Sequence, residues 1–255
     1  MSIIYIGDRE TGKTSLALEL ANPSSQNVHV LYPPYSQLKA LLYRDDLGRT
    51  QSTDANLATY DRNIEVEVTL PAGSKKIHTT WIDTPGEIWR SSWQKTNPEL
   101  WNTFLEAARN SEGVLLIVPP YREIIRPDDR IDLDDFVTQQ QWIHRFDRWV
   151  DFFQHDCPRI KHIALCLNKA DLICGVDLKQ EAQQLAYHPY NARKNWMQRH
   201  DYVFKRFFQP VRSQLAQLNQ RASGLAVKCF ITSIQNRELL ELPWIYLGTY
   251  LQHES

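Results

Sequence analysis

The sequence lacks paired cysteines, long apolar runs and any excess of positive charge. Its four cysteines form no C-x-x-C pair, which indicates reduced thiols in a cytoplasmic protein. No apolar run approaches the roughly 18 residues of a membrane-spanning helix. Basic and acidic residues nearly balance, with 29 Lys and Arg against 30 Asp and Glu, which argues against non-specific nucleic-acid binding.

Signals for secretion or lipid anchoring are also missing. Asp8 and Arg9 interrupt the apolar residues near the start, where a secretory signal would stay apolar. Position 2 is Ser rather than the Gly that myristoylation requires, and the last residues hold no Cys for prenylation. We therefore expect a cytoplasmic protein with no membrane anchor and no nucleic-acid partner.

The apolar pattern predicts an α/β fold. A continuous apolar run, typical of a buried parallel strand, covers residues 113–118, and two further strands are predicted at 162–167 and 226–231. Helical patterns separate them, including a long amphipathic stripe formed by Phe136, Ile143, Phe146, Val150 and Phe153. Residues 64–70 alternate strictly and precede a second strand at 76–83, which predicts an antiparallel pair. We expect a mostly parallel sheet with one antiparallel edge strand and helices on both faces.

The clearest motif lies within the first fourteen residues. An apolar strand at 2–6 runs into Gly7-Asp8-Arg9-Glu10-Thr11-Gly12-Lys13-Thr14, and a helical pattern follows. This is the phosphate-binding loop G-x-x-x-x-G-K-[ST] in its strand–loop–helix setting. The glycines allow its turns, and backbone N–H groups at the helix N-terminus converge on an anion. Lys13 supplies positive charge for the phosphates, and Thr14 offers a hydroxyl to Mg²⁺.

Two further motifs follow predicted strands, at the sheet edge where α/β proteins bind ligands. Asp83-Thr84-Pro85-Gly86 offers a carboxylate to Mg²⁺ through a water, and Gly86 lets backbone approach a γ-phosphate. Asn168-Lys169-Ala170-Asp171 offers a carboxylate that accepts two hydrogens from guanine, whereas adenine presents no such donor pair. Taken alone, each motif is also compatible with an ordinary strand-end turn.

Together the three motifs resemble those of the Ras-like small GTPases of the TRAFAC P-loop class. More weakly, the chain resembles the paired bacterial GTPases of conflict and defence systems. Thr232-Ser233-Ile234 resembles a degenerate fifth motif, whose backbone touches guanine in the family. The resemblance implies a P-loop NTPase fold, with a single Ras-like G domain over 1–255 and insertions near 22–58, 87–110, 119–135 and 172–200.

The resemblance also implies GTP or GDP and Mg²⁺ as cofactors. The implied metal ligands are Thr14, Thr59 and Asp83, with Thr53 as second choice for the switch-I threonine. The implied catalytic residues are Lys13, Thr59, Glu87 and Arg9. The implied nucleotide contacts are Gly7, Asp8, Arg9, Glu10, Thr11, Gly12, Lys13, Thr14, Ser15, Gly86, Asn168, Lys169, Asp171, Ser233 and Ile234.

Some of these residues depart from the family pattern. Glu87 stands where the family often has a Gln that orients the attacking water, so it either positions water or only caps a helix. Arg9 and Glu10 replace two glycines of Ras. Arg9 could reach the γ-phosphate, exclude a partner's arginine finger or face solvent, and Arg49 is a second candidate finger. We expect intrinsic hydrolysis slower than about 1 s⁻¹.

Trp89 and Trp93 follow Glu87, where the family's switch II lies. Two alternatives stay open: they form a nucleotide-dependent surface, or they pack inside the protein. The partner at such a surface would be a protein effector or regulator, with a second GTPase as one option. Residues 193–200 mix basic and aromatic side chains, and a solvated helix face is favoured there over a nucleic-acid or lipid surface.

The function that the sequence favours is a GTP-binding molecular switch. It would slowly hydrolyse GTP with Mg²⁺ and signal through loops near Thr59 and Gly86. The alternative is a pseudo-GTPase that holds guanine nucleotide as a structural part of an assembly, which Arg9, Glu10 and the degenerate fifth motif keep open. An ATP-dependent enzyme such as a kinase is disfavoured by the motif that ends in Asp171.

Overall fold

The computed structural model describes residues 2–8, 11–24, 26–44, 49–50, 61–82, 86–89, 91–191, 194–220 and 224–251. Its strands are β1 Ser2–Gly7, β2 Val28–Tyr32, β3 Tyr43–Arg44, β4 Arg49–Thr50, β5 Asp61–Leu70, β6 Gly73–Ile82, β7 Gly113–Val118, β8 His162–Leu167 and β9 Ala226–Ile231. Its α-helices are α1 Lys13–Ala21, α2 Tyr35–Leu42, α3 Ser91–Thr96, α4 Pro98–Asn110, α5 Gln139–His155, α6 Leu178–Leu185, α7 Trp196–Phe207, α8 Arg212–Asn219 and α9 Arg237–Tyr250. Its 3₁₀ helices are η1 Gly86–Trp89, η2 Arg122–Ile124, η3 Leu133–Asp135, η4 Ala170–Leu172 and η5 Gln209–Val211.

The central sheet has the strand order β2-β5-β6-β1-β7-β8-β9 in the described part of the chain. From β6 to β9 each neighbouring pair is parallel. β5 runs antiparallel to β6 in an unbroken register from Asp61 opposite Ile82 to Leu70 opposite Gly73. β2 pairs antiparallel with β5 and forms the outer edge. The predicted α/β fold, mostly parallel with antiparallel pairing at one edge, is confirmed.

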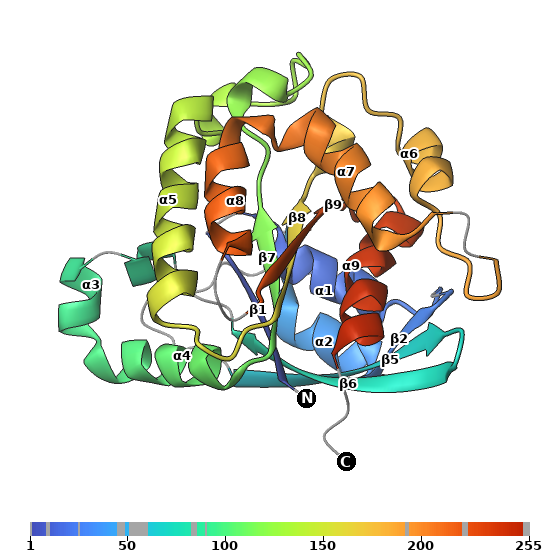
Figure 1. The fold of residues 1–255 in the computed structure, drawn as a ribbon, viewed down its shortest axis with the longest axis horizontal. Helices are drawn as coiled ribbons and strands as arrows, with labels where there is room; N and C mark the ends of the chain where they lie inside the picture. The colour runs from blue at the N-terminus through green and yellow to red at the C-terminus, as the bar shows by residue number, and fades with distance from the viewer. Residues whose placement is uncertain are drawn as a thin grey trace.

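Helices cover both faces of this sheet, as predicted (Figure 1). α1 and α9 pack together on one face, while α5 and α8 pack together on the other and α7 lies against β9. Every residue of β7 is buried because both faces are covered, which explains its continuous apolar run. Where the chain is described, no helix combines the length and apolar character that crossing a bilayer requires.

An aromatic layer joins α5 to the sheet and to α4. The largest fully buried side chains include Trp142, Phe146, Trp149 and Phe153, all from α5. The predicted apolar stripe is therefore core, with one correction. Phe136 precedes the helix, because a capping box on Thr138 starts α5 at Gln139. This layer fixes the position of α5, whose polar face reaches the loop after β1.

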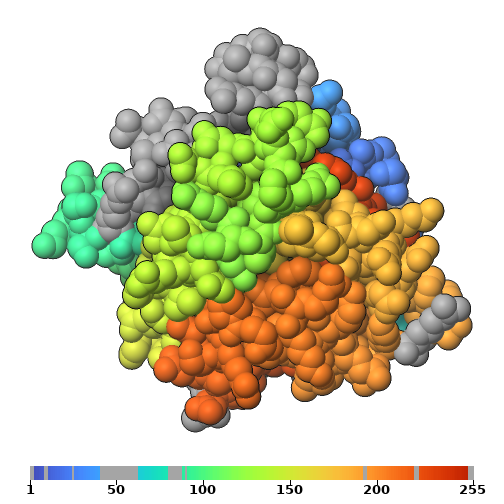
Figure 2. Space-filling model, turned by 90° about the horizontal axis from the view of Figure 1, so that it is seen from above, coloured from blue at the N-terminus to red at the C-terminus, as the bar shows by residue number. Residues whose placement is uncertain are grey.

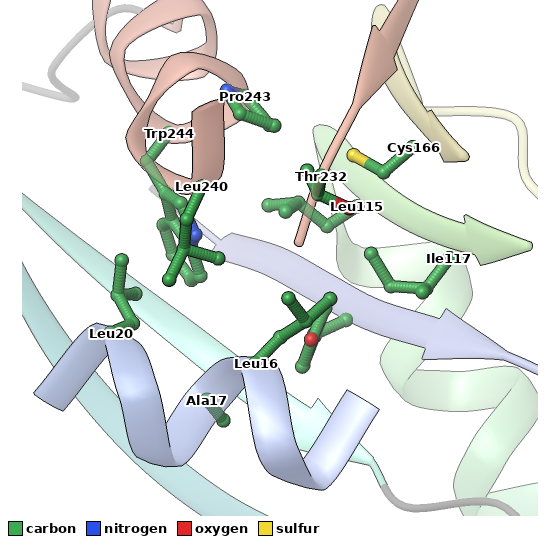
Figure 3. A pocket seen from close by; sticks show the side chains of 11 residues that line it. Leu16, Ala17, Leu20, Leu115, Ile117, Cys166, Thr232, Leu240, Pro243 and Trp244 are labelled. Carbon is green, nitrogen blue, oxygen red and sulfur yellow. The ribbon is translucent and has the colours of Figure 1, made fainter. Parts of the chain in front are cut away.

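A small apolar cavity lies between α1, α9 and the sheet (Figure 3). Leu16 and Leu20 of α1 face Leu240 and Trp244 of α9 across it. Its volume is about 10 Å³, roughly the room needed for one water molecule. The cavity is a gap in packing rather than a ligand site.

Candidate nucleotide-binding site

The loop between β1 and α1 has a shape that glycine alone permits at two positions. Gly12 is the N-cap of α1 with a φ of 83°, and a Cβ there would lie 2.6 Å from Asn168 Nδ2. A Cβ on Gly7 would lie 2.3 Å from the backbone oxygen of Ile117 on β7. Both contacts are too short for real atoms, so the loop lies this close to its neighbours only because both residues are Gly.

The Lys13 side chain forms hydrogen bonds within the loop itself. Its ammonium donates to the backbone oxygens of Gly7 at 3.1 Å and Asp8 at 2.9 Å, and the side chain is buried. The Thr11 hydroxyl donates to the same Asp8 oxygen at 3.0 Å, and the Tyr5 hydroxyl donates to the Lys13 oxygen. These bonds occupy loop carbonyls, while the first N–H groups of α1 have no helical acceptor. The loop can therefore bind an anion through N–H groups and the Lys13 charge.

Asn168 connects this loop to the far side of the site. Its amide Nδ2 donates to the Thr11 backbone oxygen at 2.7 Å, and its Oδ1 accepts from the Thr232 hydroxyl at 3.2 Å. Asn168 and Thr232 are both buried at the carboxyl ends of β8 and β9. A buried side-chain amide whose nitrogen and oxygen both form hydrogen bonds holds its partners in one geometry. The three loops after β1, β8 and β9 thus form one site.

Asp171 points toward the end of β9. Its Oδ1 accepts from the Ser233 hydroxyl at 2.5 Å, and its Oδ2 accepts from Gln235 Nε2 at 3.2 Å. Each carboxylate oxygen keeps a further acceptor site, so the group can still accept the two donors of a guanine edge. Ile234 is 49% exposed between these two partners. The contribution of Gln235 was not foreseen from the sequence, because it lies one residue beyond the predicted fifth motif.

Lys169 adopts an unusual backbone conformation for a non-glycine residue. Its φ is 57°, and it is the N-cap of η4. Its ammonium lies 5.3 Å from the ring centroid of Phe136, within the range of a cation–π contact. Left-handed backbone at a lysine is rare, and such strain is found most often at functional sites.

The segment between β7 and α5 forms a wall beside Asp171. The Arg126 N–H donates to the Leu172 oxygen at 2.8 Å, and residues 125 and 173 form a β-bridge. Figure 2 shows this green segment in the middle of its face, next to the yellow-orange segment that follows β8. A groove of about 270 Å³ is lined by Arg126, Asp128, Arg130, Ile131, Asp171, Leu172 and Gln235. Hydrogen bonds from Arg130 hold the pKa of the partly buried Asp128 carboxyl well below its usual range.

The predicted magnesium ligands are only partly placed. Thr14 and Ser15 lie half-buried in the first turn of α1, directly after Lys13. Thr59 and Asp83 lie outside the described residues, as do Arg9, Glu10 and Thr53. The backbone of Gly86 and Glu87 forms η1, and that of Arg49 belongs to β4. Within the described ranges no group of three or more His, Cys, Asp or Glu residues could hold a metal. The Thr14 hydroxyl is the kind of oxygen ligand that suits Mg²⁺.

Two arginines of α5 contact the phosphate-binding loop, and sequence reasoning missed both. Arg148 Nη2 lies 2.7 Å from one Asp8 oxygen, and Arg145 Nη1 lies 3.5 Å from the other. Burial lowers the pKa of Arg148, and the Asp8 carboxylate partly offsets that effect. These residues are separated from Asp8 by 137 and 140 positions, so no local pattern signals the pairing.

The side chains of Trp89 and Trp93 pack against the hydrophobic core rather than forming an exposed surface. Trp93 is 9% exposed, and the partly buried Trp89 lies edge to face with Phe104, Trp149 and Phe152. Of the two alternatives open in the sequence, the structure therefore shows packing for these two side chains. A nucleotide-dependent partner surface stays a prediction.

No protein-family model matches the chain, and neither does any curated protein. Among solved structures, it is similar to a GTP-binding protein from the hyperthermophilic archaeon Sulfolobus solfataricus in complex with GDP. The identity is 14% and the TM-score 0.48 over 98% of this chain. A mutation variant of SsGBP aligns with 14% identity and a TM-score of 0.46 over 97% of the chain. The alignments cover only 53% and 56% of those two structures, so we base the function on the geometry of the site.

Proposed function

We propose that the chain is a guanine-nucleotide-binding molecular switch that slowly hydrolyses GTP with Mg²⁺. The observation that carries this proposal is the Asn168 bridge, which joins the phosphate-binding loop to the strand ends that hold Asp171. A phosphate cradle and a carboxylate suited to guanine are thereby parts of one site. An adenine nucleotide would leave the Asp171 carboxylate without its donor pair, at a cost of about 1–3 kcal/mol.

Each residue has a distinct part in this proposal. The loop N–H groups and Lys13 hold the β- and γ-phosphates, and Asp171 accepts from the guanine edge. Thr14, with Asp83 and Thr59, would hold Mg²⁺, which supplies charge stabilisation at the transferred phosphate. Slow hydrolysis is supported by Arg145 and Arg148, because both are engaged with Asp8 rather than directed at a phosphate. Loss of the γ-phosphate would release the loops near Thr59 and Gly86, and a protein effector, a regulator or a second GTPase would sense the change.

The first experiment identifies the nucleotide that the protein carries. Freshly purified protein is denatured, the released nucleotide is identified by chromatography, and GTP, GDP and ATP are then titrated with Mg²⁺. Released GDP and a preference for guanine support a hydrolysing switch. Intact GTP without phosphate release supports the pseudo-GTPase instead. A preference for ATP would contradict both.

A second experiment tests the base-reading role of Asp171. In Asp171→Asn an amide donor replaces one acceptor, which disfavours the guanine 2-amino group and suits the 2-oxo group of xanthine. We expect guanine affinity to fall by at least about tenfold and xanthine nucleotide affinity to rise, since each mispaired polar group costs about 1–3 kcal/mol. Asp177→Asn is the matched control, because Asp177 only caps α6 and Asn caps equally well. Unchanged guanine affinity in Asp171→Asn would place the base elsewhere.

A further inference from the structure

Arg148 lies between two parts of the proposed nucleotide site. On one side its guanidinium forms the 2.7 Å ion pair with Asp8 of the phosphate-binding loop. The Asp8 side chain is only 11% exposed, and it forms ion pairs with this partner and, over a longer distance, with Arg145. A buried carboxylate that loses its counter-ion is strongly unfavourable. The conformation of the loop is therefore tied to the position of Arg148.

On its other side Arg148 faces two indole rings. The guanidinium carbon lies 5.1 Å from the ring centroid of Trp89 and 5.7 Å from that of Trp149. The two rings meet edge to face at 4.5 Å. Among the described residues, Arg148 Nε and Trp89 Nε1 are buried without a hydrogen-bond partner. The Arg148 guanidinium thus meets indole rings on this side rather than hydrogen-bond acceptors, and such cation–π contacts strengthen when water is excluded.

Trp89 ends η1, the 3₁₀ helix that begins at Gly86. We propose that Arg148 is a positioning residue that couples the phosphate-binding loop to η1. This inference rests on the proposed function. A bound phosphate adds negative charge near Asp8 and changes the attraction on Arg148, and the Trp89 ring follows the guanidinium that it contacts. A ligand shifts such an equilibrium only by its different affinity for the two positions, so GDP and a GTP analogue must be compared.

Two substitutions on the same helix separate this role from a general loss of charge. Arg148→Met removes the contacts with both Asp8 and Trp89. Arg145→Met is the matched control, because Arg145 contacts the same Asp8 carboxylate from the same helix. The fluorescence of Trp89 is isolated as the difference between each protein and its Trp89→Phe version. It is measured with GDP and with a non-hydrolysable GTP analogue.

We expect Trp89 fluorescence to differ between GDP and the analogue in the wild type and in Arg145→Met, and not in Arg148→Met. The preference for one nucleotide over the other should change by at least about fivefold in Arg148→Met. Arg148→Lys keeps the charge and lacks the planar guanidinium. It should keep the ion pair with Asp8 and the wild-type nucleotide affinity, while the Trp89 fluorescence response is weaker than in the wild type.

The outcomes separate this inference from the function on which it rests. A wild-type protein that binds no guanine nucleotide overturns both. Guanine binding with a full Trp89 response in Arg148→Met, or with no response in the wild type, overturns the coupling alone. Should Arg148→Met fail to fold, an unchanged Trp89 response in Arg148→Lys gives the same negative answer.

Discussion

At the scale of single residues, Gly12 decides whether the phosphate-binding loop can close against Asn168. Gly12→Ala would place a methyl group 2.6 Å from Asn168 Nδ2 and would force a left-handed backbone that costs about 1–2 kcal/mol. We expect lower stability in urea unfolding and loss of guanine nucleotide binding in a titration. Gly175→Ala is the control, because Gly175 has a φ of 70° and open space around it. Equal nucleotide affinity in the two variants would contradict the close packing at Gly12.

His200 makes stability depend on pH. Its Nδ1 accepts from the Cys229 N–H at 3.1 Å, and burial, with help from nearby Lys228, lowers its pKa from 6.5 to about 4. In the unfolded chain His200 binds a proton at higher pH than in the fold. Its contribution is therefore complete above about pH 6.5 and is lost as the pH falls toward 4. Burial lowers the pKa of His162 as well, in the same direction.

The measurement for His200 is the free energy of unfolding between pH 7 and pH 4 for the wild type and His200→Gln. Gln keeps an acceptor for the Cys229 N–H and does not titrate. We expect a shallower decline for the variant than for the wild type. Parallel curves would mean that His200 does not account for the acid sensitivity.

Residues of the site differ in how far sequence could predict them. The glycines, Lys13 and the group from Asn168 to Asp171 stand in short local motifs with a direct chemical meaning. Arg148 carries no such signal, because its role depends on a contact with Asp8 across 140 positions. On the helix it is one of several polar residues between buried aromatic ones, a pattern typical of an ordinary amphipathic surface.

At the scale of elements, α9 fastens the end of α1 to the edge of the sheet. Arg237 donates to the backbone oxygens of Glu19, Leu20 and Val28, and it also pairs with Glu241. Glu241 in turn accepts from the N–H groups of residues 26 and 27. These bonds satisfy carbonyls that the end of α1 leaves without helical partners. The loop between α1 and β2 is thereby held by a buried ion pair.

Glu241→Ala should destabilise the protein by about 3–5 kcal/mol, because the buried Arg237 guanidinium loses its counter-ion and two N–H groups lose their acceptor. The matched comparison is Glu65→Ala, which breaks an ion pair with the 57% exposed Lys76 and should cost no more than about 1 kcal/mol. Chemical denaturation measures both. Similar losses of stability in the two variants would show that burial does not determine how much an ion pair contributes to the free energy of unfolding.

Sequence periodicity predicted most of the helices and strands, and there are physical causes both where local propensity holds and where it fails. The break at Pro210 separates α7 from α8, since proline cannot continue the hydrogen-bond ladder of a helix. Pro243 nevertheless lies inside α9, where ten residues in succession are buried and packing outweighs local propensity. The pattern of residues 27–32 fits a short strand and an extended arm equally well, because only the pairing of β2 with β5 makes this segment an edge strand.

At the scale of the whole molecule, ligand binding should raise stability by mass action. GDP at one hundred times its dissociation constant would add about 2.7 kcal/mol to the free energy of unfolding. For a chain of this size that corresponds to roughly 5–10 °C in the midpoint of thermal unfolding. ADP at the same concentration should shift the midpoint much less. Equal shifts with both nucleotides would remove the case for guanine recognition.

The Asn168 bridge makes nucleotide binding depend on how much of the chain has folded. Its two partners lie 157 residues before it and 64 residues after it, so the pair of contacts is complete only when the outer strand β9 has joined strands made much earlier in synthesis. Retention on immobilised guanine nucleotide would then separate chains that include β9 from chains arrested before β9. The fluorescence of a nucleotide analogue added during translation should change, as a sign of binding, only after β9 has left the ribosome.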